Sequence, residues 1–100
     1  MSCVVTFTIF PLDPQDKESL APYVARALRI IKDSGLPYEL GAMGTVMEGE
    51  FDEVMDVVRR CHDELRKDCD RVYMTMAVDS KKSDGGRMVQ KVKSVGDILE

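Results

Sequence analysis

Three carboxylates stand close together in the run YELGAMGTVMEGE, residues 38–50. Glu48 and Glu50 would lie on the same side of an extended chain, and Glu39 belongs to the strand-like segment before them. Such a pair could work as a general acid and a general base. The alternative is that Glu39 and Glu50 are solvated, and that Glu48 caps the following helix or reaches solvent at the edge of a sheet.

Glu48 has apolar neighbours, and a carboxylate in such surroundings suits binding better than catalysis. It can pair with a cation or accept a hydrogen bond from an exocyclic amine, while Met43 and Met47 offer adaptable apolar contact. Two methionines at such positions belong to a packed core more often than to a ligand site. The surroundings of Glu48 are nevertheless the reason that we expect a binding protein and not an enzyme.

Other kinds of catalytic or metal site lack the residues that they need. His62 is the only histidine, and it lies on a predicted helix. A nucleophilic serine or cysteine therefore lacks a well-placed general base to activate it. The cysteines Cys3, Cys61 and Cys69 show no C-x-x-C spacing, so no metal site is expected. The segment PLDPQD after the first apolar run has two prolines without N–H groups and two acids, which argues against a phosphate-binding loop.

Charge and hydropathy exclude further classes. The formal net charge of -4 argues against nucleic acid as a partner. We interpret the basic residues near the C-terminal end as a solvated face, because acids, glycines and apolar positions separate them; they are Lys81, Lys82, Arg87, Lys91 and Lys93. No apolar run approaches the roughly twenty residues that cross a bilayer, and MSCVVTFTIF lacks the features of a signal peptide. With reduced cysteines, these features predict a cytoplasmic protein without a membrane partner.

Periodicity in the first half of the chain predicts two short strands after a strand and a helix. Residues 3–10 alternate as a strand with Val5, Phe7 and Ile9 on one face. A helix is predicted between Ser19, a possible N-cap, and Gly35, with this apolar side: Leu20, Val24, Ala27, Leu28 and Ile31. Residues 38–42 and 45–48 are predicted as strands joined by a turn at Gly41 and Gly44.

The second half repeats the pattern and adds a helix. A helix after Gly49 has this apolar stripe: Phe51, Val54, Val58, Cys61 and Leu65. Residues 71–79 are predicted as the last strand, and residues 88–99 as a terminal helix. The order β-α-β-β-α-β predicts one α+β domain over residues 1–100, with a ferredoxin-like antiparallel sheet, two helices on one face and a C-terminal helical extension.

The other face of this sheet would be too apolar to remain in water. Its expected residues are Val4, Phe10, Tyr73 and Ala77, together with Thr6, Thr8 and Thr75. We therefore expect the sheets of different subunits to associate into a homodimer or homotetramer.

Several segments together resemble the signature of the thiamine-binding protein family, which includes small YkoF-related proteins. The similar segments are YEL (38–40), MGTVMEG (43–49), DEV (52–54), IFP (9–11), residues 71–79 and KVKSV (91–95). The similarity extends over nearly the whole chain, and M-G-T-x-x-E-G is its most specific part. The resemblance implies a ferredoxin-like subunit that assembles through its sheets into dimers and commonly tetramers. It also implies binding of thiamine or of its hydroxymethylpyrimidine part, without catalysis and without a separate cofactor.

The chemistry of thiamine suggests which residues would contact it. Its thiazolium is a cation, and its aminopyrimidine carries an exocyclic donor and ring-nitrogen acceptors. Glu48 and Thr45 are therefore the leading candidates. In a regular strand these two side chains should point to opposite faces. The further candidates are Thr6, Thr8, Met43, Met47 and Glu39.

A second interpretation comes from a different functional class. The chain could be an oligomeric regulatory or interaction module similar to ACT domains. Such a module would bind an amino acid or another small metabolite at a subunit interface.

Overall fold

The protein has a four-stranded antiparallel sheet, and its computed structural model describes residues 2–15 and 18–100. Strand β1 (Ser2–Pro11) pairs with both β3 (Thr45–Gly49) and β4 (Val72–Lys81), and β2 (Tyr38–Leu40) pairs with β3. The strand order is β2-β3-β1-β4. The element order βαββαβ plus a C-terminal helix confirms the predicted α+β, ferredoxin-like arrangement.

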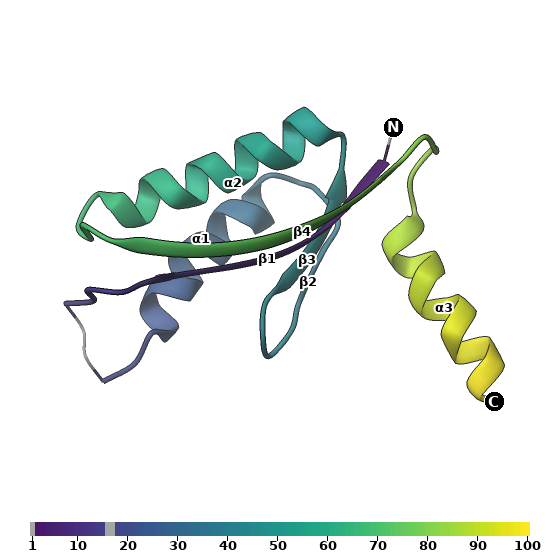
Figure 1. Cartoon of the computed structure of the whole chain (residues 1–100), viewed down its shortest axis with the longest axis horizontal. Coiled ribbons are helices and arrows are strands. Elements are labelled where there is room, and N and C mark those ends of the chain that lie inside the picture. The colour runs from purple at the N-terminus through teal and green to yellow at the C-terminus, as the bar shows by residue number, and fades with distance from the viewer. Residues whose placement is uncertain (1, 16–17) are drawn as a thin grey trace.

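Two helices, α1 (Ala21–Asp33) and α2 (Phe51–Arg66), cover one face of the sheet (Figure 1). α1 ends where the sequence predicts, because Gly35 takes a left-handed conformation with φ +80°. α2 begins with a capping box in which the side chains of Glu50 and Glu53 each accept a hydrogen bond from the other's backbone N–H. This accounts for Glu50, one of the three clustered carboxylates.

The core lies between the helices and the sheet. Val5, Phe7 and Ile9 of β1 point into it, as predicted. Leu20 and Phe51 were predicted on the apolar sides of their helices and are instead exposed; Leu20 is the N-cap of α1 and Phe51 is the first residue of α2, so each has a helical neighbour on one side only. Tyr23 and Val57 are buried in the core in addition to the predicted helix positions.

The face of the sheet away from α1 and α2 is called the open face here. Its residues on β1 and β4 are Val4, Thr6, Thr8, Phe10, Tyr73, Thr75 and Ala77, as the pairing register requires. The rings of Phe10 and Tyr73 lie side by side with centroids 5.4 Å apart. On the opposite side of the edge strand β4, Met74, Met76 and Val78 are also exposed, although α2 contacts part of this strand.

The last helix, α3 (Arg87–Leu99), lies apart from α1 and α2 and points away from the sheet (Figure 1). None of its residues is buried. Its large apolar side chains are between 58% and 83% exposed; they are Val89, Val92, Val95, Ile98 and Leu99. This helix is the predicted C-terminal extension.

Candidate functional site

A cavity of about 250 Å³ lies between α1, the far end of β1 and the β2–β3 connection. We call it the hairpin pocket. It forms because β3 begins at Thr45, opposite Phe7, so that β1 beyond Phe7 has no strand beside it on this side. Its lining residues are Phe7, Thr8, Ile9, Phe10, Leu20, Val24, Ala27, Leu28, Ile31 and Leu40 to Thr45.

The rim of the hairpin pocket is held by two hydrogen bonds. The hydroxyl of Thr8 donates to the backbone carbonyl of Met43 at 2.9 Å, and the N–H of Gly41 donates to the carbonyl of Gly44 at 2.8 Å. A Cβ at Gly44 would lie 2.6 Å from Oγ1 of Thr8, so only glycine allows this close approach. The pocket therefore combines apolar walls with a rim of backbone groups and the side chain of Thr45.

The structure divides the predicted ligand residues among three places. Thr8, Met43 and Thr45 line the hairpin pocket. Met47 is fully buried in the core. The other three lie on the open face, to which Thr8 also belongs; Thr6 and Glu39 are exposed there, and Glu48 is buried. Thr45 and Glu48 thus point to opposite faces of β3, as strand alternation predicts.

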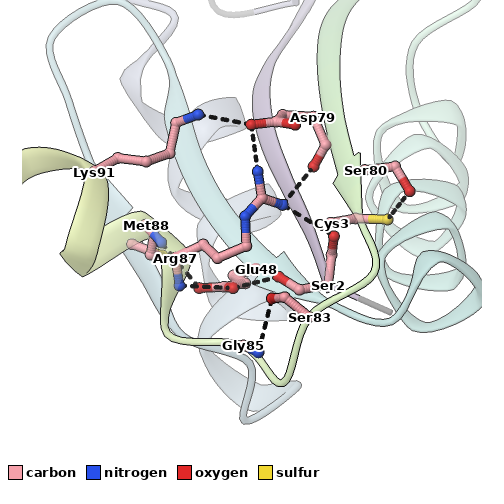
Figure 2. A network of polar contacts seen from close by, with 10 residues as sticks. All are labelled: Ser2, Cys3, Glu48, Asp79, Ser80, Ser83, Gly85, Arg87, Met88 and Lys91. Atoms are coloured by element: carbon pink, nitrogen blue, oxygen red, sulfur yellow. Dashed lines mark hydrogen bonds and ion pairs between the residues drawn. The ribbon is translucent and has the colours of Figure 1, made fainter.

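Glu48 is buried under the start of α3 and is only 3% exposed. Its carboxylate accepts hydrogen bonds from the hydroxyl of Ser2 at 2.5 Å and from the backbone N–H groups of Arg87 at 3.0 Å and Met88 at 3.1 Å (Figure 2). These N–H groups belong to the first turn of α3, where a negative charge also interacts favourably with the helix dipole. Glu48 therefore caps α3, whereas Glu50 caps α2.

Arg87 closes this arrangement from the other side. Its Nη1 donates to the backbone carbonyls of Ser2 at 3.1 Å and Asp79 at 3.2 Å, and its Nη2 contacts the Asp79 carboxylate at 2.5 Å (Figure 2). Lys91 contacts the same carboxylate at 2.6 Å. The Arg87 side chain is only 13% exposed, so its interpretation as part of a solvated face was wrong, because the Glu48 cap draws it against the sheet.

We call these residues the Glu48 cluster: Ser2, Glu48, Asp79, Arg87, Met88 and Lys91. Burial alone would raise the pKa of Glu48, but the three hydrogen bonds and the charge of Arg87 hold this pKa below its ordinary value. The hydrogen bond and charge of Lys91, with the charge of Arg87, likewise lower the pKa of Asp79. Both carboxylates are therefore ionised at neutral pH.

Acid should weaken the attachment of α3. Because the folded-state pKa of Glu48 is lowered, its contribution to stability is complete above its unfolded pKa of about 4.3 and is lost as the pH falls through the folded-state value. Amide hydrogen exchange at pH 5 and pH 3 should show that α3 opens more readily at pH 3, relative to α1 and α2 at the same pH. Glu48→Gln removes this titration, so the same acid response in that variant would contradict the prediction.

Sequence reasoning singled out Glu48 but missed its partners. Arg87 is 39 positions away along the chain, and nothing local connects the two. The one available signal was the pair Gly85-Gly86 directly before a predicted helix. Both glycines have positive φ, and Gly86 is the N-cap of α3 and lacks a capping side chain. The helix therefore depends on a distant carboxylate for its cap.

Within the described part of the chain, no three histidine, cysteine or acidic side chains come together as a possible metal site. No helix formed by the described residues has the length and apolar character needed to span a membrane.

This chain is similar to known proteins both in sequence and in structure. The sequence profile of a family described as thiamine-binding protein matches residues 5–96. A UPF0045 protein of Mycobacterium bovis, Mb1933, is 38% identical over 96 residues, which cover 95% of this chain and 92% of the relative. The crystal structure of the hypothetical protein MJ1052 from Methanocaldococcus jannaschii superposes with a TM-score of 0.85 at 32% identity, covering 95% of this chain and 96% of the other.

A third similar structure is that of a Thermotoga maritima protein, TM0486, described as a candidate for thiamine biosynthesis or salvage. It superposes with a TM-score of 0.76 at 26% identity, covering 92% of this chain and 99% of that one.

Proposed function

Because this chain belongs to the thiamine-binding protein family, we propose that it binds the aminopyrimidine part of thiamine, free or within the vitamin, in the hairpin pocket. The observation that carries this proposal is the pocket itself, which brings together Thr8, Met43 and Thr45. The description of the Thermotoga maritima protein points to the same class of ligand. Binding, without a chemical step, is the proposed activity.

The size and chemistry of the pocket suit one flat heteroaromatic ring. Its volume of about 250 Å³ is below the roughly 300–1,000 Å³ of sites for drug-sized ligands. The apolar side chains of Val24, Leu28 and Leu40 would cover the ring faces, and the hydroxyl of Thr45 and the backbone of the rim would meet its polar edge. The thiazolium cation would remain outside, beside the exposed Met43.

For Glu48, Glu39, Thr6 and Met47 a ligand role stays a prediction, and the present proposal does not depend on it. Glu48 already accepts three hydrogen bonds from protein groups. A cation would have to compete with the start of α3 for this carboxylate.

We further propose that the protein acts in the cytoplasm and self-associates through its sheet into a dimer or tetramer. The buried thiols of Cys3, Cys61 and Cys69 are consistent with a reducing compartment. The apolar open face and the exposed edge strand β4 support self-association, because surfaces of this kind mark interfaces.

Calorimetry tests the proposed ligand directly. Hydroxymethylpyrimidine and thiamine should both release or absorb heat on binding, and the isolated thiazole part should not. An amino-acid panel in the same experiment tests the ACT-like alternative. Heat with an amino acid and none with either pyrimidine compound would reject the proposal in favour of that alternative.

Thr45→Val tests the assigned pocket. The substitution keeps the shape of the side chain and removes the hydroxyl. One lost hydrogen bond costs roughly 1–1.5 kcal/mol of binding free energy. We therefore expect hydroxymethylpyrimidine to bind about tenfold more weakly. Thr75→Val, on the open face, is the matched control and should leave the affinity unchanged. Equal affinities for both variants and the unmodified protein would place the ligand elsewhere.

A further inference from the structure

A groove of about 650 Å³ lies between α1 and β2, next to the hairpin pocket. The groove and the pocket share three lining residues, Val24, Leu28 and Leu40, so a ligand that fills the pocket can extend into the groove. Tyr38 forms part of the opposite wall. It pairs with Met47, which is fully buried in the core, and paired residues of neighbouring strands point to the same face, so Tyr38 points toward α1.

Two cationic side chains, Arg29 and Lys32, line this groove. Val24, Leu28 and Lys32 recur every four residues, so Lys32 continues the row of α1 side chains that begins in the hairpin pocket. It lies one turn beyond Leu28, about 6 Å further along the helix axis. Neither cation forms an ion pair or a side-chain hydrogen bond with another residue that the structure describes. Both charges are therefore available to a ligand.

The charge of the groove differs in sign from that of the whole chain. Among the described residues that line it, Asp33 is the one carboxylate, so two cations and one anion leave an excess of one positive charge. The acid of β2, Glu39, pairs with Val46 and points to the open face, away from the groove. The formal net charge of the chain is -4. A local positive excess beside the pocket of an acidic protein favours an anionic ligand group.

We propose that the groove binds a phosphate group, and that the preferred ligand is a phosphate ester of hydroxymethylpyrimidine. The ring occupies the hairpin pocket, and the phosphate on its methylene group lies between Arg29 and Lys32. A guanidinium offers paired donors to phosphate oxygens, and an ammonium adds a compact positive charge. In thiamine the same methylene carries the thiazolium cation, which Arg29 and Lys32 repel, in agreement with its proposed place beside Met43. This inference rests on the proposed function and names the chemical form of its ligand.

Calorimetry with hydroxymethylpyrimidine and with its phosphate ester tests the inference. The ester should bind about tenfold more tightly to the unmodified protein at low salt, because its phosphate gains charge-assisted hydrogen bonds. Both cations are exposed, so raising the sodium chloride concentration should reduce this advantage by screening, while the affinity for the uncharged alcohol stays the same.

Two substitutions in the groove should change the affinity for the ester in opposite directions. Lys32→Gln removes a positive charge and should weaken ester binding about fivefold. Asp33→Asn removes the negative charge and should strengthen it about twofold. Neither should change the affinity for hydroxymethylpyrimidine. Lys82→Gln is the matched control, because Lys82 is an exposed lysine in the β4–α3 connection, outside the groove, and this variant should bind the ester like the unmodified protein.

The outcomes separate this inference from the proposed function. Equal affinities of the unmodified protein for the ester and the alcohol would overturn the phosphate site and leave the hairpin pocket as the pyrimidine site. An equal loss of ester affinity in Lys32→Gln and Lys82→Gln would also overturn it, because the effect would then come from the overall charge of the protein. Absence of heat with both compounds would reject the proposed function, and the inference with it.

Discussion

Replacing Glu48 by alanine should lower the free energy of unfolding by about 2–3 kcal/mol, because three hydrogen-bond donors lose a buried, ionised acceptor. The first turn of α3 loses its cap at the same time, since Gly86 offers no side chain in its place. Glu48→Gln keeps the shape and one acceptor oxygen, so its effect should be about half as large. Urea unfolding followed by circular dichroism gives these values.

Glu39→Ala is the control for Glu48→Ala, because this carboxylate lies on the same face of the sheet but is exposed. Its effect should stay within about 0.5 kcal/mol, as for most surface substitutions. Hydrogen exchange adds a local measurement: amides of α3 should exchange faster in Glu48→Ala, while those of α2 follow global stability. Equal stability of Glu48→Ala and the unmodified protein would contradict the role of Glu48 as the cap of α3.

Val24→Phe should reduce the affinity for hydroxymethylpyrimidine about 100-fold, which corresponds to roughly 2.7 kcal/mol. Val24 lies on the side of α1 that lines the hairpin pocket, so a phenyl ring at this position would occupy the space proposed for the pyrimidine. Because the ring would fill a cavity and not an already packed core, the free energy of unfolding should change by less than about 1 kcal/mol.

Ala25→Phe is the matched control for Val24→Phe. Ala25 is the next residue of α1, is exposed and does not line the hairpin pocket. The same enlargement there should leave the calorimetric affinity unchanged. Unchanged affinity in Val24→Phe, with the fold intact by circular dichroism, would exclude the hairpin pocket as the binding site.

Much of the fold follows from short-range patterns. The alternation of residues 3–10 and the helical spacing before Gly35 are properties of neighbouring residues, so they predict both the elements and their inward faces. Two errors occur at helix starts, where Leu20 and Phe51 continue the apolar spacing but are exposed. Periodicity describes one side of a helix and carries no information on where its packing partner ends.

The candidate site was predicted less completely than the fold, because it depends on how distant segments of the chain pair. Strand alternation separates Thr45 from Glu48, and the structure places one in the hairpin pocket and the other under α3. That β3 begins beside Phe7, leaving a cavity beyond it, depends on the register between two strands. Register depends on which side chains of both strands pack together, and a single segment does not contain that information.

The amino-acid sequence by itself determined the order of the elements, the inward face of β1 and the family to which the chain belongs. Only the tertiary structure decided the role of Glu48, because its donors Ser2, Arg87 and Met88 come from both ends of the chain. A buried carboxylate is stable where donors converge on it, and their convergence is a property of the folded chain. The acid before Gly49 therefore has a structural role, because the first turn of α3 donates to its carboxylate.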